Sequence, residues 1–342
     1  MEFIRYTPCH YDLLLQRRQE PHFPAALLQQ NFVDWYYTGT EGSSLFLFVD
    51  KGEVAGLIGV ECLSFAYEGQ AMQVAASNNH VAFMPGIGGL QLLYWMKMAP
   101  YTLVFGGSAA THAILRQYRW HFFPPVPLLL ANRRGQASGS SFAWRNRLKG
   151  VLARCLPEVR LARSRAAIRR EGGGALQVSE ESSLQPDMLP TVSPFRLRLA
   201  PSLDYLRWRY DPRLSFVRYR LFRIADDRQT IGYVILKESP EQILVSQCDG
   251  DNALQLACGV LLALAEVTER DLQPREMVLS CCHALMQGVF LRHGFYSSLH
   301  RRPFVMGSAR EPLRIEHNTR QWLINFDWND NGLRPPFLHE AS

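Results

Sequence analysis

The sequence predicts an α/β (α+β) protein of two tandem domains, each with a mixed, largely antiparallel central sheet flanked by helices. The first observation is a Trp-x-Tyr phrase that occurs twice, at Trp35 and again at Trp208, half the chain further on. The second is that two β-rich runs follow each phrase across a polar turn, and the later run is entered through Gly56 in one copy and Gly232 in the other. Because both landmarks repeat at nearly one offset, we infer an internal duplication in which each copy begins with a β-hairpin.

The rest of each copy follows one order of elements. After the hairpin we expect another strand, an apolar helix, a further strand and a closing helix, which ends near Trp120 in the first copy and near Phe295 in the second. The offset between these two aromatic residues agrees with the offsets of the tryptophans and glycines. The strand and apolar helix are expected at residues 73–83 and 88–99, and again at 243–249 and 252–268.

The landmarks also divide the chain into domains. We expect a first domain at residues 1–135 and a second at 195–320. The stretch 136–194 is basic and rich in proline and glycine, with three consecutive glycines at 172–174, and is predicted to be a linker. Residues 321–342 are predicted to be a C-terminal tail.

The composition is typical of a soluble globular protein of the cytoplasm. The 342 residues suffice for two domains, and 47% are hydrophobic while 20% are charged. The start of the chain lacks a signal-peptide pattern and no run of 18 apolar residues occurs, so we expect no membrane span. The seven cysteines are scattered without metal-ligand spacing, which predicts reduced thiols and no metal site.

The net charge of +6 is concentrated in one segment. Residues 133–170 hold eleven lysines and arginines and a single acid, Glu158. A solvated basic helix between the domains is the favoured interpretation, and a dedicated polyanion or membrane-surface site is the alternative. A basic chain is suited to nucleic acid or to a polyanionic small molecule such as a nucleotide or coenzyme.

A glycine-rich stretch and a closing helix carry a resemblance to a known family. The sequence VAFMPGIGGLQLL at 81–93 resembles the pyrophosphate loop of the GNAT acyltransferase superfamily, and LRHGF at 291–295 resembles its closing helix. A glycine-rich turn before a helix leaves backbone N–H groups free at a positive dipole end, where a diphosphate binds well. The resemblance implies acyl-CoA, with an acetyl or hydroxyacyl group, as co-substrate. The implied coenzyme-binding residues are Phe83, Met84, Gly86, Ile87, Gly88, Gly89 and Leu90.

The sequence also departs from the superfamily pattern. Met84 and Pro85 replace the usual Arg or Gln before the first glycine, so a plain turn remains the alternative. In the second copy Gly250 stands between two aspartates, which would repel a diphosphate. We therefore expect the first domain to bind the coenzyme and the second, as a degenerate copy, to shape the acceptor site.

Acyl transfer to an amine needs a base and an escape for the thiolate. His80 is our candidate base, with Asn79 beside it on the strand before the glycine-rich loop, and a structural histidine is the alternative. Ser108 begins a helix that the resemblance places near the thiol, although an ordinary N-cap explains it equally well. The tyrosine acid of many superfamily members is replaced by Leu115 and Phe290. Tyr118, one turn later, could substitute only if the end of the helix unwinds toward the cleft.

A narrower resemblance concerns the second aromatic phrase. YLRWRYDPRLSFVRY at 205–219 is similar to a Trp-Arg-Tyr phrase of two-domain bacterial sugar N-acyltransferases. It implies an acceptor amine on a nucleotide-linked amino sugar, used for surface polysaccharide or lipopolysaccharide synthesis. The implied acceptor-binding residues are Trp208, Arg209, Tyr210 and Arg213. If Trp208 is buried, Arg209 should face the cleft and Arg207 the solvent, because residues two apart on a helix diverge.

Two other functions remain open. Fem-type aminoacyltransferases are also basic tandem proteins of this superfamily and use aminoacyl-tRNA, but the insert here lacks their coiled-coil heptads. A non-catalytic binding protein with a decayed acyltransferase fold would explain the absent tyrosine and the altered loop. In the preferred interpretation the partners are small molecules rather than nucleic acid, and the formation of a homo-oligomer is left open.

Overall fold

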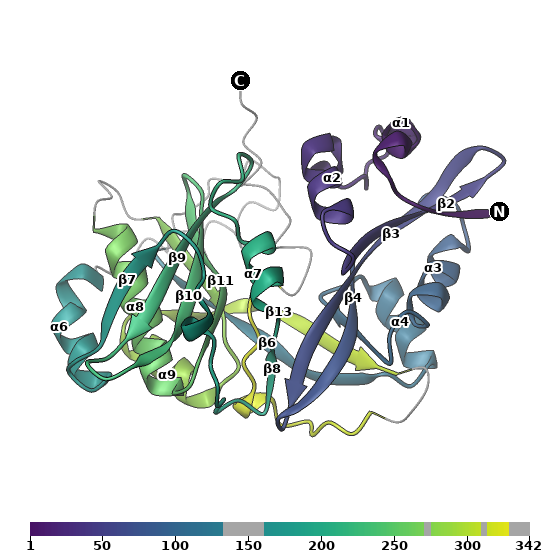
Figure 1. Ribbon diagram of the computed structural model, residues 1–342. Helices are drawn as coiled ribbons and strands as arrows, with labels where there is room; N and C mark the ends of the chain where they lie inside the picture. Colours follow the sequence, from purple (N-terminus) through teal and green to yellow (C-terminus); the bar gives the residue numbers. More distant parts are fainter. Residues whose placement is uncertain (133–160, 270–274, 309–312, 328–342) are drawn as a thin grey trace, which may run out of the picture.

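The structure is a computed structural model that describes residues 1–132, 161–269, 275–308 and 313–327. Within these residues thirteen strands form one continuous sheet, and the predicted fold class is confirmed (Figure 1). The first half contains β1 (Glu2–Arg5), β2 (Ser43–Asp50), β3 (Glu53–Tyr67), β4 (Gln70–Ala82), β5 (Tyr101–Phe105), β6 (His121–Ala131), α1 (Tyr11–Leu14), α2 (Gln30–Thr38), α3 (Ile87–Trp95) and α4 (Ala109–Gln117). The second half contains β7 (Gln177–Glu181), β8 (Leu197–Leu199), β9 (Arg218–Ala225), β10 (Thr230–Glu238), β11 (Gln242–Gly250), β12 (Glu276–Ser280), β13 (Tyr296–Gly307), α6 (Leu161–Glu171), α7 (Leu203–Arg209), α8 (Ala253–Thr268) and α9 (Ala284–Arg292). Short 3-10 turns lie at Pro8–His10, Leu15–Arg17, Ala25–Leu28, Pro186–Met188 and Thr319–Gln321.

The two halves repeat one pairing pattern. In each, an edge strand and a hairpin are antiparallel, and a following parallel pair is made by β4 with β5 or by β11 with β12. The first hairpin turns at Lys51 and Gly52, which have φ values of 52° and 84°. Two successive positive φ values are typical of the turn that matches strand twist in a hairpin, so the predicted turn lies where its glycine places it.

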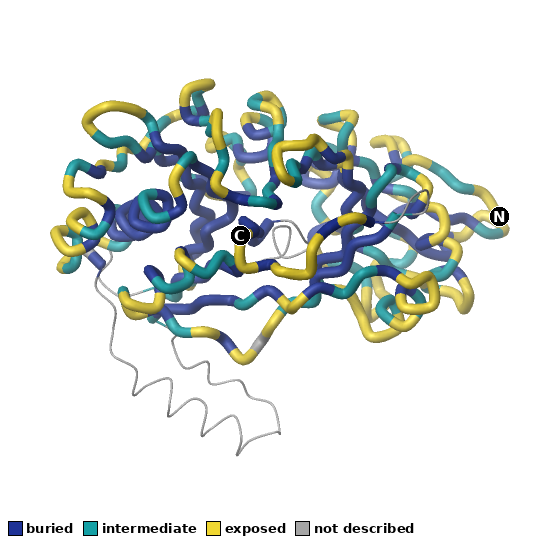
Figure 2. The backbone as a smooth tube through the Cα atoms, turned by 90° about the horizontal axis from the view of Figure 1, so that it is seen from below, coloured by how far each residue is buried: buried dark blue, intermediate teal, exposed yellow. Residues whose placement is uncertain are grey.

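The halves exchange their last strands. The order of the sheet is β1-β2-β3-β4-β5-β13-β6-β12-β11-β10-β9-β7, so β13 of the second half lies between β5 and β6 of the first. In return β6 pairs with β12. Buried backbone therefore continues through the middle of the molecule from one half to the other (Figure 2).

The parallel pairs are short in both halves. β4 pairs with β5 only over 74–76, and β11 pairs with β12 only over 242–244, after which the paired strands diverge. Each diverging strand also has a register shift against its hairpin neighbour, next to Gly59 in the first half and to Leu236 in the second. The sheet therefore contains two equivalent V-shaped openings.

The repeated tryptophans meet at the contact between the halves. Trp35 on α2 and Trp208 at the end of α7 stack with ring centroids 5.2 Å apart and an interplanar angle of 28°. Both side chains are half-buried rather than fully buried. The phrase is thus repeated because both copies contribute to one helix-to-helix contact.

The domain boundaries differ from those expected. The linker predicted at 136–194 includes α6 and β7, which belong to the second half: β7 pairs with β9, and Ile168 of α6 lies in one apolar cluster with α8. Arg165 of α6 is paired as well, since it contacts Glu266 of α8 and Glu269 directly after this helix, each at 2.9 Å. Residues 133–160, which hold most of the predicted basic segment, lie outside the described residues.

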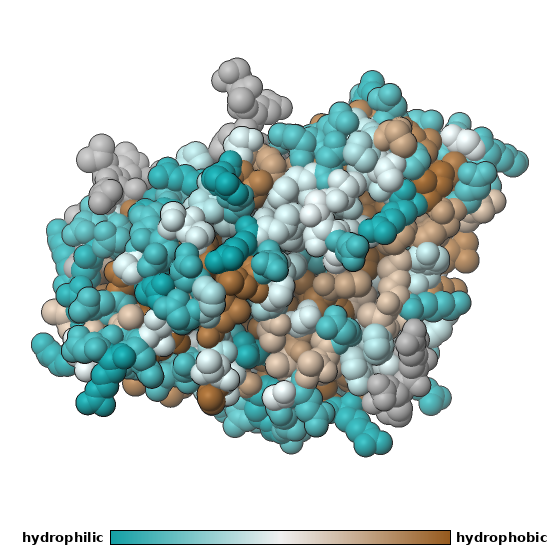
Figure 3. Space-filling view, viewed as in Figure 1, coloured by the Kyte–Doolittle hydropathy of each residue, from teal (hydrophilic) through white to brown (hydrophobic). Residues whose placement is uncertain are grey.

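Within the described ranges, no helix is long and apolar enough to cross a bilayer. The face seen in Figure 3 is mainly hydrophilic over the second half, at the left, while apolar residues surface mostly at the centre and right.

Candidate functional site

The opening between β4 and β5 contains a cavity of about 990 Å³. Its walls come from the diverging strands, the loop after β5, the loop before α2 and the exchanged strand β13. The lining residues with polar or titratable side chains are His22, Ser77, Asn78, Asn79, His80, Ser108, Thr111, Arg301 and Arg302. No aspartate or glutamate is among the described lining residues, so the cavity favours anionic over cationic ligands.

The equivalent opening in the second half is filled by the chain itself. Residues 323–327 lie between the diverging ends of β11 and β12: the Asp327 amide donates to the Ser246 carbonyl at 3.3 Å, and the Ser280 hydroxyl donates to the Ile324 carbonyl at 2.8 Å. The Asn325 side chain pairs with both the amide and the carbonyl of Cys248, at 3.2 and 3.0 Å. Residues 323–327 of the segment expected to be a tail are therefore folded against the second half, while 328–342 lie outside the described residues. Of the two openings, the first is the one that the described residues leave unfilled.

The glycine-rich loop lies where β4 ends and α3 begins. Gly86 caps the helix with a φ of 84°, which an L-residue adopts only with strain. A Cβ added at Gly86 or Gly89 would meet no atom within 4 Å, and one added at Gly88 would meet only the Ala82 side chain at 3.6 Å. Because the first N–H groups of a helix have no partner inside it, this helix end offers an uncovered cradle that fits a diphosphate.

The other residues expected in the loop differ in their positions. Met84 and Leu90 are exposed, while the Ile87 side chain is buried in the apolar cluster under α3. Phe83 packs against Phe23 with ring centroids 6.5 Å apart. Ile87 and Phe83 are thus held by the fold, and this part of the loop presents backbone rather than these side chains to a ligand.

His80 lies in the cavity wall, where burial favours its uncharged form. Burial lowers its pKa, although hydrogen bonds to Gln91 and to the Gly88 backbone act in the opposite direction. Its Nε2 atom is buried without a hydrogen-bond partner among the described residues. A neutral imidazole can accept a proton, and His80 lies in the wall of the cavity, so its role as a base stays a prediction.

The neighbouring residues Asn78 and Asn79 form a bulge in β4. Asn79 has a φ of 45°, and its amide nitrogen donates to the Tyr37 hydroxyl at 2.7 Å. The Asn78 amide lies directly over Gly59, where an added Cβ would stand 1.8 Å from Asn78 Oδ1. Any side chain at position 59 would collide with the Asn78 amide, so only glycine there lets the bulge of β4 lie this close to β3.

Ser108 and Tyr118, at the two ends of α4, differ in their relation to the cavity. Ser108 lines the cavity and also caps the helix, since its Oγ accepts from the Thr111 amide at 3.1 Å. Tyr118 is 49% exposed at the C-terminal end of α4 and is not among the lining residues. The helix continues regularly to Gln117 and does not unwind toward the cleft, so the condition under which Tyr118 could act as the acid is not met.

The second aromatic phrase does not face the cavity. Arg209 is 2% exposed, and its guanidinium lies between the rings of Tyr36 and Tyr210 with Nε 3.9 Å from Glu61. The expectation that Arg209 faces an open cleft is wrong, because α7 packs this side against α2 and a buried carboxylate neutralises the charge. Tyr210 and Arg213 border a separate pocket of about 280 Å³, and the Arg213 side chain, 90% exposed, pairs with Asp211.

Two cavity-lining features were missed at the sequence level. Arg301 and Arg302 come from β13, which belongs to the other half of the chain. Arg302 of β13 pairs with Val126 of β6, so the two side chains lie on the same face of the sheet. The Arg302 guanidinium lies 5.5 Å from the centre of the Phe326 ring. The loop of residues 21–26 was also missed, and its Pro-His-Phe-Pro run was the available signal.

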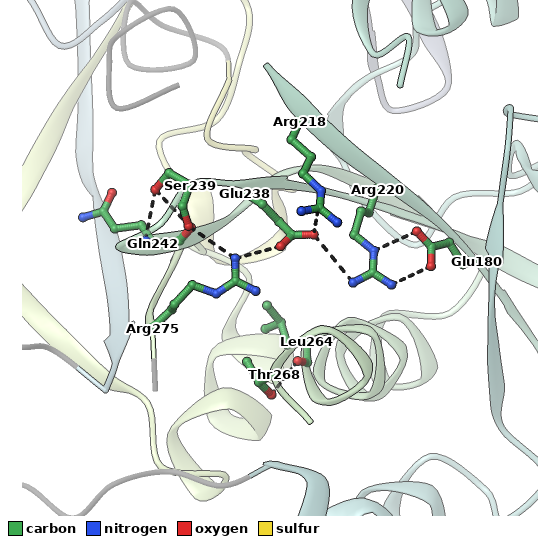
Figure 4. Close-up of polar contacts among 9 residues, drawn as sticks. All are labelled: Glu180, Arg218, Arg220, Glu238, Ser239, Gln242, Leu264, Thr268 and Arg275. Atoms are coloured by element: carbon green, nitrogen blue, oxygen red, sulfur yellow. Dashed lines mark hydrogen bonds and ion pairs between the residues drawn. The ribbon is translucent and has the colours of Figure 1, made fainter. Parts of the chain in front are cut away.

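A further polar pocket, of about 500 Å³, lies at the far end of the second half. Three arginines surround the buried Glu238: Arg275 at 2.7 Å, Arg220 at 3.6 Å and Arg218 at 3.9 Å (Figure 4). Arg220 also makes a two-pronged contact with Glu180 at 2.7 and 2.5 Å. These charges pair with one another and connect β7, β9 and β10 with the residue that precedes β12, which is a structural role.

Comparisons with known proteins establish the fold. No family model and no curated protein matches the sequence. A probable N-acyltransferase from Enterococcus faecalis V583 is 9% identical and covers 89% of this chain and 71% of its own, with a TM-score of 0.54. A GCN5-related N-acetyltransferase from Kribbella flavida is 11% identical and covers 89% of this chain and 70% of its own, with a TM-score of 0.54. N-myristoyltransferase from Saccharomyces cerevisiae, solved with bound myristoyl-CoA, is 7% identical and covers 89% of this chain and 82% of its own, with a TM-score of 0.51. The chain therefore has the fold of the GNAT acyltransferases, as its resemblance implied.

Proposed function

We propose that the chain is an acyl-CoA-dependent N-acyltransferase whose first half binds the acyl-CoA. The observation that carries this proposal is the contrast between two equivalent openings in one sheet. The first is an open cavity beside an uncovered helix N-terminus, and the second is filled by residues 323–327. One binding site per chain follows.

The residues of the first half have separate tasks in this proposal. Backbone N–H groups of Gly88 and Gly89 hold the diphosphate, and acyl-CoA when bound supplies the activated acyl group. His80, kept neutral by burial, accepts a proton from the acceptor amine as the amine nitrogen attacks the thioester carbonyl. The C–S bond then breaks and coenzyme A leaves as the thiolate. Asn79 stands beside it in the cavity wall.

The proposed acceptor is an amine carried on an anionic molecule, and we favour a nucleotide-linked amino sugar of surface polysaccharide synthesis. Its support is the charge of the cavity, in which Arg301 and Arg302 are present and the described lining residues include no carboxylate. Arg301 is exposed, and the contacts of the described residues give it no ion pair. A guanidinium is well suited to pair with phosphate oxygens.

The experiment is a titration of the full chain with acetyl-CoA, followed by thiol release with amines of different charge. We expect one equivalent of acetyl-CoA to bind, and release to depend on a phosphate-bearing amino sugar more than on the neutral sugar. The variant His80→Gln should bind acetyl-CoA normally and release thiol slowly. Binding without amine-dependent release would support a non-catalytic protein instead. Thermal stabilisation by aminoacyl-tRNA but not by acetyl-CoA would support the Fem-type alternative.

A further inference from the structure

We infer that Gln91 is a positioning residue for His80: it holds the imidazole proton on Nε2, so that Nδ1 is the nitrogen that takes the proton of the acceptor amine. Gln91 lies on α3, the helix whose N-terminus is proposed to hold the diphosphate. It acts through His80 rather than on the substrate. This role rests on the proposed function and deepens it, because it assigns separate tasks to the two nitrogens of the proposed base.

The direction of the Gln91 amide is set by a backbone carbonyl. The Gln91 side chain is completely buried, and its Nε2 donates to the Val81 carbonyl at 3.0 Å. Because a carbonyl oxygen only accepts hydrogen bonds, the atom that faces Val81 must be the amide nitrogen. The amide oxygen of Gln91 is therefore turned away from this carbonyl and is left for another donor.

That donor is the imidazole of His80. Gln91 Oε1 and His80 Nε2 are both buried, and each lacks a hydrogen bond of ordinary geometry with the described residues. Among the groups that oppose the effect of burial on the His80 pKa, the Gln91 side chain comes first, and the Gly88 backbone acts in the same direction. A buried donor or acceptor left unpaired costs free energy, so a slight turn that joins these two atoms satisfies both.

The other nitrogen of His80 keeps access to the cavity. Nδ1 is not among the enclosed atoms, and no contact of the described residues occupies it. A neutral imidazole has one N–H donor and one acceptor nitrogen. With the Nε2 proton directed at Gln91, the lone pair lies on Nδ1 and takes the proton that the amine loses on attack. The imidazolium that results keeps its donor bond to the Gln91 oxygen.

A glycine of the first hairpin lets Gln91 reach this place. A Cβ added at Gly56 would stand 2.5 Å from Gln91 Nε2 and 2.9 Å from the Val81 carbonyl oxygen. The counterpart Gly232 is crowded instead by the backbone of Asp249. The close approach of a helix glutamine to the hairpin glycine is therefore a property of the half with the open cavity.

The second half repeats the glutamine without the histidine. The run Leu-Gln-Leu of α3 recurs at 254–256 in α8. By the ladders of the two hairpins, the position of His80 is taken by Cys248. Gln255 acts instead on Asp226, whose pKa it helps to lower. Gln255 is thus a matched control for Gln91 within the same chain.

Histidine NMR of the full chain tests this assignment without any substrate. The His80 signal is the one, out of ten, that His80→Gln removes. At a pH above the usual histidine range, its nitrogen shifts report which ring nitrogen carries the proton. We expect the proton on Nε2. A proton on Nδ1, held by the Gly88 carbonyl, would overturn the inference.

Two replacements of Gln91 separate positioning from a loss of packing. Gln91→Met and Gln91→Glu both remove the amide nitrogen that donates to Val81, but only glutamate keeps an oxygen for His80. We expect Gln91→Glu to keep the proton on Nε2, and Gln91→Met to give a mixture of both forms and a lower His80 pKa. Gln255→Met should change neither. Equal effects of the two Gln91 replacements, or none from either, would overturn the inference, and the spectrum of the unaltered chain decides if Gln91→Met does not fold.

Kinetics show whether the positioning serves the transfer. With acetyl-CoA and a UDP-linked amino sugar, Gln91→Met should lower kcat about tenfold, the value of one hydrogen bond to a charged group, and leave the acetyl-CoA Kd within about twofold. Gln91→Glu should restore most of kcat. An unchanged kcat in Gln91→Met would overturn the role of Gln91 in the transfer. Absence of amine-dependent thiol release from the unaltered chain would instead overturn the proposed function, while the NMR result still decides where the His80 proton lies.

Discussion

Replacing Gly89 with valine should remove acyl-CoA binding without weakening the fold. Gly89 is the third residue of α3, and a Cβ added there meets no atom within 4 Å. The isopropyl group would therefore occupy the open space over the helix N-terminus, where the diphosphate is proposed to bind. Its folding cost is small, since valine is no worse than glycine inside a helix.

The size of the effect follows from the bonds that the valine prevents. Two backbone N–H groups, at Gly88 and Gly89, are proposed to donate to the diphosphate. A hydrogen bond to a charged group contributes roughly 1.5–3 kcal/mol, so the loss is roughly 3–6 kcal/mol. At about 1.4 kcal/mol for each factor of ten, the acetyl-CoA Kd should rise by about a hundredfold to ten-thousandfold.

Calorimetric titration with acetyl-CoA measures the Kd, and thermal unfolding without ligand measures the fold. A matched control is Gly288→Val in α9, a helical glycine whose added Cβ would meet only the flexible end of Arg292, at 3.3 Å. We expect the control to bind like the unaltered chain. Equal Kd values for Gly89→Val and the unaltered chain would refute the placement of the coenzyme.

Three other predictions concern buried polar groups. The lowered pKa of His80 keeps it neutral as pH falls below the usual histidine range, so kcat should hold there, and His80→Gln should abolish the pH dependence that remains at lower pH. Burial lowers the pKa of Lys237 to about 8, so the unfolded chain binds more protons above that pH. The free energy of unfolding should therefore rise between about pH 8 and 10, and urea unfolding of Lys237→Met should show a flatter slope. Asn325→Leu leaves the Cys248 amide and carbonyl unpaired and should cost roughly 2–6 kcal/mol in urea unfolding, with unchanged acetyl-CoA affinity.

The hairpins, the duplication and the glycine-rich loop could be predicted, because each depends on short stretches of sequence. The hairpins follow from alternation and from turn residues such as Gly52, whose φ of 84° reports the conformation that selects glycine. The duplication follows from landmarks such as Trp35 and Trp208, which stack in the structure. The glycine-rich loop also lies where its sequence placed it, at the start of α3.

Strand partners and helix faces could not be predicted in this way. A β-rich run shows that a strand forms but does not specify which strand it pairs with, so nothing indicated that β13 would enter the first half and bring Arg301 and Arg302 to the cavity. The inward face of α7 depended on Glu61, whose charge makes it favourable to bury Arg209. A signal for Glu61 existed, because it is the one charged residue within the apolar run 54–66.

The most direct test of the central claim is hydrogen exchange of the full chain with and without saturating acetyl-CoA. We expect slower exchange in residues 77–90 and 104–108, which border the first opening and the α3 N-terminus. We expect no change in 242–250 and 276–282, where residues 323–327 already fill the equivalent space. Protection confined to the second half, or no protection anywhere, would contradict the assignment of acyl-CoA to the first half.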